Sequence, residues 1–279
     1  MDALYHLMDH ALPFAWAGDL FMKRALLAVV LVAPVCAAMG VMVVNFRMAF
    51  FSDAISHSAF TGVALGVLLG INPLYTLIAF GIVVGLAIIS VRRLSSLSVD
   101  TVIGVFFSFA VALGIVIISA RKGLTRDLQS YLYGDVLTVG DGEILAMGLL
   151  FLAAIVFLSL WFNALILIGI NERLAKAQGI RVKALEYGYA LLLALVVTLS
   201  IRVIGLLLVT AMLVVPAAAG RNLAGSVRGM FWASVGIGLA SGVIGLIGSY
   251  YWDSATGATI ILVACGFFIL SQAVSVVRR

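Results

Sequence analysis

The sequence predicts an all-α membrane protein, a polytopic bundle of about eight or nine transmembrane helices that forms one domain over residues 1–279. Hydrophobic residues make up 64% of the chain and charged residues only 10%, whereas soluble domains carry about 25% charged residues. Apolar segments follow one another almost without interruption from Phe21 to Val277. Most of them approach the roughly 20 residues that cross a bilayer as a helix. A water-soluble fold is therefore excluded.

Nine segments are apolar enough to cross the membrane. They run over residues 21–44, 52–69, 73–91, 99–120, 143–170, 185–200, 203–219, 230–250 and 258–277. Almost no loop separates the pair around Arg202, so one of these two segments is a candidate for a partial or re-entrant element. Charged residues interrupt segment 1–20, which is expected to lie at the membrane interface and not to be a cleaved signal peptide.

The basic residues predict the orientation of the chain. If Arg278 and Arg279 are cytoplasmic, alternation through nine crossings puts most of the 17 Lys and Arg on the cytoplasmic side, as the positive-inside rule requires. The N-terminus then lies outside. The external loops carry acidic residues, which predict an outer face that attracts cations. These residues are Asp127, Asp135, Asp141, Glu143 and Asp253.

The chain has 28 glycines, and some recur at helical spacing, as in Gly62, Gly66 and Gly70 or in Gly238 and Gly242. Small residues at such spacing let helix backbones approach closely. No GxxxxGK[ST] phosphate loop occurs, so any ATP must be hydrolysed by another chain. The sequence predicts no catalytic residue, no enzyme activity and no tightly bound cofactor.

Asp53 and His57 form the most informative polar pair. They are four residues apart, so on a helix they share one face, flanked by the hydroxyls of Ser52 and Ser56. A carboxylate with a neutral imidazole suits Zn, Mn or Fe, and ionisable groups inside membrane segments are candidates for function. The alternative is structural: Ser52 or Asp53 caps a helix N-terminus and His57 forms a hydrogen bond inside the bundle.

Asp100 is a second candidate at the start of an apolar segment. Ser98 and Asp100 are residue types favoured at helix N-termini, so a helix-start carboxylate is the favoured interpretation over a metal ligand.

Two loops predicted to be cytoplasmic have features of partner contacts. Residues 171–180 begin with the helix-start residue Asn171 and contain the helix-stop residue Gly179. Residues 216–225 follow a transmembrane segment and lead into a short polar stretch. Ordinary basic loops that obey the orientation rule would also explain either one.

Several stretches together resemble the permease family of zinc, manganese and iron ABC importers. The resemblance extends from Phe21 through most of the chain, and it rests on the order and spacing of short motifs. These are 24–27, Arg47 to Ala49, Asp53 with 57–59, Asp100 and Thr101 with Ile103 and Gly104, 132–137, Ala175 with Gly179, 215–219, 249–253 and 257–259. The chain departs from the family pattern at Gly220, where Ala is common, and at 60–62, where Pro is frequent.

The resemblance implies a type II importer of the bacterial inner membrane. Two permease copies would form the pathway, two cytoplasmic ABC ATPases would drive it, and an extracytoplasmic protein would deliver the metal. Asp53 and His57 match positions that line the metal path. Segment 221–230 would be the coupling helix that contacts the ATPase, with loop 172–179 beside it; the residues implied are Glu172, Ala175, Gly179, Arg221, Asn222, Leu223 and Gly225.

Other functions stay open from the sequence alone. An ABC permease for metal chelates would need a wider cavity without direct metal ligands, and an ion-driven secondary transporter would use Asp53 and Asp100 as proton relays. An intramembrane metalloenzyme is disfavoured because the sequence has no HExxH motif. The sequence does not identify the metal, because selectivity depends on site geometry.

Overall fold

The structure is a computed structural model that describes residues 19–120 and 139–277. In these residues all the regular secondary structure is helical, and nine helices are long and apolar enough to cross a membrane. The predicted all-α bundle of transmembrane helices is therefore confirmed. Residues 1–18, which form most of the predicted interfacial segment, lie outside the described ranges, as do Asp127, Asp135 and the motif at 132–137.

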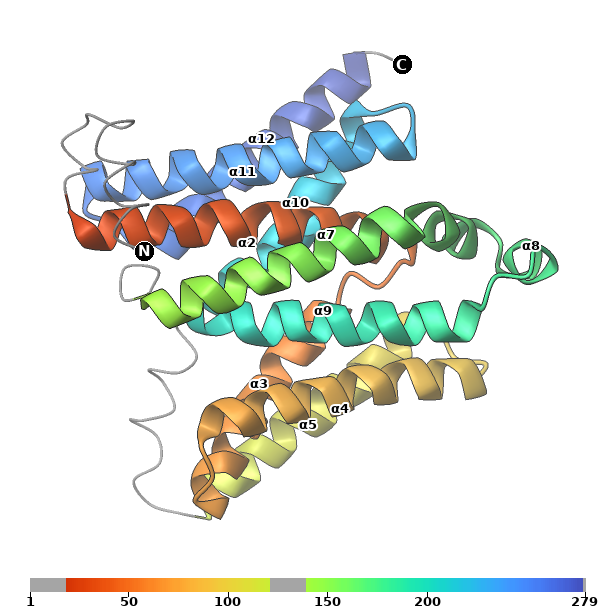
Figure 1. Ribbon diagram of the computed structural model, residues 1–279, viewed down its shortest axis with the longest axis horizontal. Helices are drawn as coiled ribbons and strands as arrows, with labels where there is room; N and C mark the ends of the chain where they lie inside the picture. Colours follow the sequence, from red (N-terminus) through yellow and green to blue (C-terminus); the bar gives the residue numbers. More distant parts are fainter. Residues whose placement is uncertain (1–18, 121–138, 278–279) are drawn as a thin grey trace. The chain divides into compact units, whose positions relative to one another are not determined.

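The helices in chain order are drawn in Figure 1. They are α2 (Leu20–Asn45), α3 (Phe51–Leu69), α4 (Pro73–Leu94), α5 (Val99–Ser119), α7 (Asp141–Ile170), the short α8 (Glu172–Ala177), α9 (Val182–Ile204), α10 (Leu206–Leu223), α11 (Val227–Trp252) and α12 (Thr256–Val277). The predicted segments agree with these nine long helices to within about three residues at most ends. The segments on either side of Arg202 are two full helices, separated at Gly205, whose φ of 81° breaks the helix.

Side-chain caps explain several helix starts. The side chains of Asn72, Ser98, Asn171 and Ser226 each accept a hydrogen bond from a backbone N–H in the first turn of α4, α5, α8 and α11. At the other end of α3, Gly70 has a φ of 68°, and its left-handed conformation lets the amide of Ile71 reach the Gly66 carbonyl. The chain turns there directly into α4.

The helices group into two compact units, which are described separately. One unit contains residues 42–120 and 154–202, and the other contains residues 19–41, 139–153 and 203–277.

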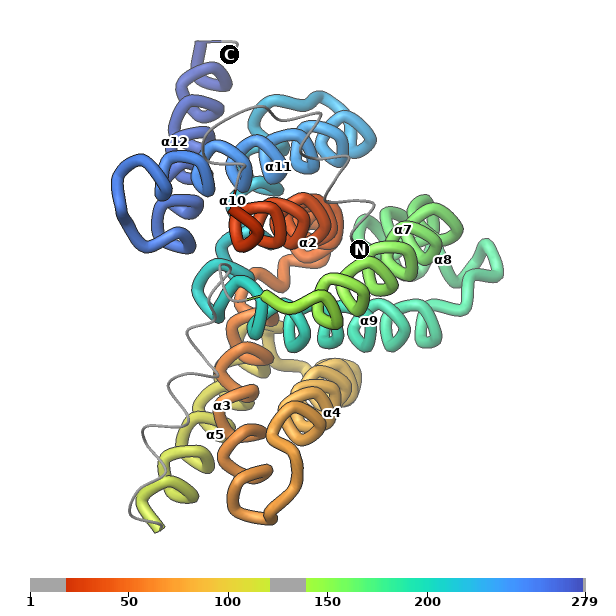
Figure 2. The backbone as a smooth tube through the Cα atoms, turned by 60° about the vertical axis from the view of Figure 1, so that its left-hand side comes forward, coloured from red at the N-terminus to blue at the C-terminus, as the bar shows by residue number. Residues whose placement is uncertain are grey.

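In the first unit, α3 packs along α4 and α5, as both views show (Figures 1 and 2). The contact between α3 and α4 is close because Gly62 faces the α4 backbone. A Cβ atom at Gly62 would lie 2.7 Å from Leu77 Cα and 2.9 Å from the Thr76 carbonyl oxygen. On the α5 side, the Thr61 hydroxyl donates to the Ala110 carbonyl at 2.5 Å. The predicted role of glycine spacing in close packing is confirmed on this helix.

In the second unit, α10, α11 and α12 pack against one another, and α11 also contacts α2 (Figure 2). Gly238 faces α2, where a Cβ atom would lie 2.8 Å from Ala37 Cβ. Gly220 brings α10 against α11, where a Cβ atom would lie 2.8 Å from the Met230 carbonyl. The residue that departs from the family pattern at 220 therefore occupies a position with no room for the common Ala.

Candidate functional site

Asp53 and His57 lie in the first two turns of α3. The helix begins at Phe51, its N-cap is Phe50, and no side chain caps it. Ser52 does not act as the N-cap, and its hydroxyl donates to the Ala49 carbonyl at 3.3 Å. Asp53 lies in the first turn, where the helix dipole favours its negative charge.

One face of this part of α3 is open. Asp53, His57 and Phe60 are half-buried, whereas the other seven residues from Phe51 to Phe60 are buried. The spacings of four and three residues put all three on one stripe of the helix. The aspartate and the histidine are thus the polar groups on the accessible stripe of residues 51–60, which are otherwise buried.

The α5 helix borders this stripe. The His57 ring lies edge-to-face on the Phe107 ring, with centroids 4.9 Å apart and an interplanar angle of 77°. One turn later, the hydrogen bond from Thr61 ties α3 to α5. The imidazole is therefore oriented by an aromatic neighbour while it stays accessible from the open side.

Asp100 is separate from this pair. It is exposed in the first turn of α5, where the Ser98 side chain caps the helix. These features agree with the helix-start interpretation. Within residues 19–120 and 139–277, no three His, Cys, Asp or Glu residues come together as a metal-binding group. A full coordination sphere around Asp53 and His57 needs further ligands, from water or from groups outside these described ranges.

The short helix α8 is closed at both ends by local hydrogen bonds. The Asn171 side chain accepts from the Leu174 amide at 3.0 Å. At the C-terminus, the Gly179 amide donates to the Lys176 carbonyl at 3.0 Å and the Ile180 amide to the Ala175 carbonyl at 3.1 Å. This pair of bonds is a Schellman motif, and Gly179 supplies the required left-handed residue with a φ of 77°. The predicted helix start and stop are both confirmed.

The two sides of α8 differ in exposure. Ala175 is fully buried, whereas Arg173 and Leu174 are exposed. Ala175 therefore contributes to the packing of α8 and not to its outer surface. A partner that approaches α8 would meet Arg173 and Leu174, which the sequence analysis did not single out.

Replacing Gly179 by Ala is expected to loosen α8. A left-handed backbone costs an L-residue about 1 kcal/mol, although no atom lies within 4 Å of the position that a Cβ would occupy. The backbone amides of residues 178–180 should exchange with deuterium about fivefold faster. Gly225→Ala is the matched control, because this glycine also has open space and lacks a positive φ. Equal exchange rates of these amides in Gly179→Ala and Gly225→Ala would contradict the inference that an L-residue is strained at position 179.

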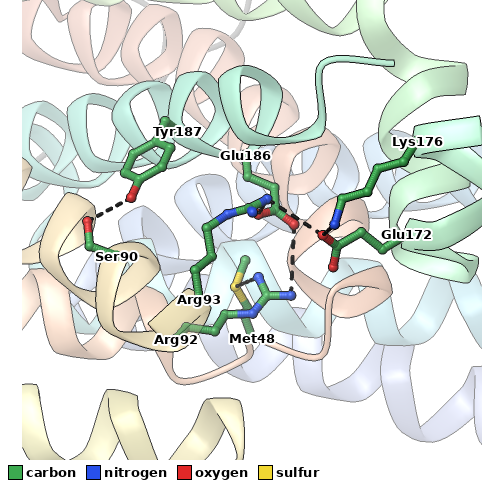
Figure 3. A network of polar contacts seen from close by, with 8 residues as sticks. All are labelled: Met48, Ser90, Arg92, Arg93, Glu172, Lys176, Glu186 and Tyr187. Atoms are coloured by element: carbon green, nitrogen blue, oxygen red, sulfur yellow. Dashed lines mark hydrogen bonds and ion pairs between the residues drawn. The ribbon is translucent and has the colours of Figure 1, made fainter. Parts of the chain in front are cut away.

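A network of ion pairs joins α4, α8 and α9 (Figure 3). Arg93 Nη2 lies 2.5 Å from Glu186 Oε2, and Arg92 Nη2 lies 4.0 Å from Glu186 Oε1. Arg93 Nη2 also lies 3.9 Å from Glu172 Oε1, which pairs with Lys176 Nζ at 2.7 Å. The hydrogen bond from Lys176 and the nearby positive charges lower the pKa of Glu172, so this carboxylate is ionised at neutral pH.

Sequence reasoning missed Glu186 and gave Arg92 and Arg93 only a role in orientation. Glu186 lies 93 residues from Arg93 in the chain, and its side chain is only 5% exposed. Its one sequence signal is a carboxylate near the start of an apolar segment, which by itself also fits a helix-start residue.

The segment 221–230, predicted as one coupling helix, is divided in the structure. Arg221, Asn222 and Leu223 end α10, residues 224–226 form a loop that contains the exposed Gly225, and α11 begins at Val227. The Ser226 side chain caps α11, which explains the break.

Within this segment, the residues differ in what they can contact. Arg221 is exposed, whereas Asn222 is half-buried and donates from Nδ2 to the Ser271 hydroxyl of α12 at 3.1 Å. Asn222 therefore ties the end of α10 to α12, and Arg221 and Gly225 are the exposed ones among the four coupling residues predicted within this segment.

Known proteins resemble the chain over almost its full length. A sequence profile described as the ABC 3 transport family matches residues 19–275. The high-affinity zinc uptake system membrane protein ZnuB of Haemophilus influenzae is 30% identical over 88% of this chain and 95% of its own. The manganese import system permease protein ScaB of Streptococcus gordonii is 34% identical over 90% of both chains. The structure of PsaBC from Streptococcus pneumoniae in complex with Fab superimposes with a TM-score of 0.77 at 32% identity, covering 97% of this chain and 95% of that one.

Proposed function

The chain belongs to the ABC 3 transport family of permeases, and from this premise we propose that it moves a divalent transition-metal ion, Zn, Mn or Fe, into the bacterial cytoplasm. A permease is not an enzyme, so a separate ATPase chain hydrolyses the ATP. The names of the relatives refer to zinc and manganese, which supports a bare ion over a chelate as the cargo.

The observation that carries the proposal is the open stripe on α3. Asp53 and His57 are accessible there, while the surrounding residues of the helix are buried. A charged group inside a membrane segment is costly and is retained where it serves a pathway. One carboxylate oxygen and one imidazole nitrogen form a mixed donor set that binds Zn, Mn or Fe.

Two donors occupy only part of the coordination sphere of such an ion. A second copy of the chain, related by a two-fold axis, would supply another Asp53 and His57, and together the four side chains would replace part of the hydration shell. Two-fold symmetry is the commonest arrangement of homo-oligomers. The metal is the transported substrate in this proposal and not a resident cofactor. Asp100 remains a weaker candidate because it is exposed at a helix start.

The orientation proposed from the basic residues puts the C-terminus and α8 in the cytoplasm and the N-terminus outside. The exposed Arg173 and Leu174 of α8 are then available to a cytoplasmic ATPase, as are Arg221 and Gly225. Glu172 and Gly179 hold α8 in shape, and the buried Ala175 packs it against the rest of its unit. An extracytoplasmic binding protein would deliver the ion at the opposite side.

The test of the function is the metal content of cells that lack this chain, measured for all first-row transition metals. A loss confined to one element is the expected result, and it would identify the cargo. Re-expression of the chain should restore that element. Unchanged content of every metal in medium where the element is limiting would contradict the proposal.

A further inference from the structure

The short helix α8 is too small to hold its own position. It has six residues, and isolated helices below about 12 residues are marginally stable in water. Its caps fix its internal shape, and its place against the other helices of its unit depends on the buried Ala175 and on polar contacts. An ion pair joins α8 to α4, in which Glu172 Oε1 lies 3.9 Å from Arg93 Nη2.

Arg93 is itself held firmly. Glu186 is a nearly buried carboxylate, and a buried charge is costly unless a partner of opposite charge neutralises it. Arg93 supplies the close partner at 2.5 Å, and Arg92 lies beside the other oxygen. Arg92 is also in contact with Met48, whose sulfur lies 3.7 Å from Nη1. The Arg93 Nη2 atom lies between two carboxylates, 2.5 Å from Glu186 Oε2 and 3.9 Å from Glu172 Oε1 (Figure 3).

The α4 helix that carries Arg93 is also packed against the helix that carries the candidate metal site. A Cβ atom at Gly85 of α4 would lie 3.4 Å from Ile55 of α3 and 3.5 Å from both Phe51 of α3 and Ala194 of α9. Ser90 and Tyr187 join α4 and α9 by a hydrogen bond of 2.8 Å. The α4 helix thus packs along α3 and is tied to α9 by Ser90 and by Arg93, and the ion pair of Arg93 with Glu172 links α8 to this group.

We propose that Arg93, anchored by Glu186, is a positioning residue that fixes α8 on the end of α4 and transmits displacement of α8 to the α3–α4 pair. This inference rests on the proposed function, in which α8 faces the ATPase and α3 carries the metal path. Because Glu172 is partly exposed, the contact is weak enough to be adjusted during a transport cycle. Asp53 and His57 would move together with the backbone of α3, so neither side chain has to change its own conformation when α8 is displaced.

Three variants separate this role from simple stabilisation. Glu172→Gln removes the charge that Arg93 contacts. Arg93→Lys keeps a positive charge beside the buried Glu186 but replaces the fork by a single ammonium group. Lys176→Gln is the matched control, because Lys176 pairs with Glu172 within α8 and not with α4.

The first measurement is the distance distribution between spin labels at Ala177 and Ser119, both exposed and both in the unit that contains α3 to α5. The purified full chain is used, with Cys36→Ala and Cys265→Ser so that only these two sites are labelled. Glu172→Gln and Arg93→Lys should each broaden the distribution, and Lys176→Gln should leave it as in the parent chain. Equal widths in all four proteins would overturn the positioning role.

The second measurement is the number of metal ions taken up per ATP hydrolysed by the complete complex in vesicles. A variant that only lowers the amount of folded complex reduces uptake and hydrolysis together and leaves this ratio unchanged. Glu172→Gln and Arg93→Lys should lower the ratio by about two- to fivefold, and Lys176→Gln should not. An unchanged ratio in these two variants would overturn the transmission role. A wild-type complex that takes up no metal would instead refute the proposed function, and the spin-label widths would still decide the positioning of α8.

Discussion

Cells that carry the double substitution Asp53→Asn and His57→Gln are expected to take up the metal at about one hundredth of the wild-type rate or less. Loss of residues that merely orient metal ligands lowers metal affinity by about 10- to 100-fold, and this substitution replaces the proposed ligands themselves. In a two-fold dimer each substitution acts twice. The measurement is the initial rate of uptake of the limiting metal in cells that express equal amounts of each variant.

Asp100→Asn is the matched control for this prediction. It removes a carboxylate from the same part of a helix, the first turn, but from an exposed position on α5. Near-wild-type uptake is expected, since only a modest interaction with the helix dipole is lost. Uptake lost in Asp100→Asn and retained in the double variant would reverse the assignment of the two sites.

Gly62→Ala is expected to destabilise the protein by forcing α3 away from α4. The added Cβ would lie 2.7 Å from the Leu77 Cα and 2.9 Å from the Thr76 carbonyl, both of which are backbone atoms of α4. A backbone cannot swing aside as a flexible side chain can, so the two helices must separate along their contact. Overpacking of this kind costs about 1–3 kcal/mol, against a gain of about 1 kcal/mol in helix propensity.

The same substitution at Gly104 isolates the effect of the close contact. Gly104 is also inside a transmembrane helix, and no atom lies within 4 Å of the position of its Cβ. Gly104→Ala should melt at or above the wild-type temperature in detergent, whereas Gly62→Ala should melt several degrees lower and give less monodisperse protein. Equal melting temperatures would show that α3 and α4 are not in contact through Gly62.

The sequence was sufficient to predict the nine long helices because each one is a long apolar segment, and capping residues mark several of the helix ends. Pro73 after Asn72, Ser98 before Val99 and Gly179 after α8 all act locally, so their signals can be read directly from neighbouring residues. The same local reasoning predicted that Asp53 and His57 share a face of one helix. Their common face follows from a spacing of four residues.

The parts that could not be predicted depend on contacts between distant residues. The pairing of Arg93 with Glu186 joins residues from α4 and α9, and no periodicity in the sequence relates them. The division of 221–230 follows from the Ser226 cap of α11, a residue that the sequence analysis did not consider. The buried position of Ala175 depends on how α8 packs, which short-range patterns do not determine.

The most direct test of the central claim is metal uptake by vesicles that contain the purified chain, its ATPase and its binding protein, with no ion gradient across the membrane. The account predicts uptake of the bare ion that requires ATP and that is lost in the Asp53→Asn, His57→Gln double variant while ATP hydrolysis continues. Uptake by the double variant at the wild-type rate, or uptake that needs an ion gradient and not ATP, would contradict it.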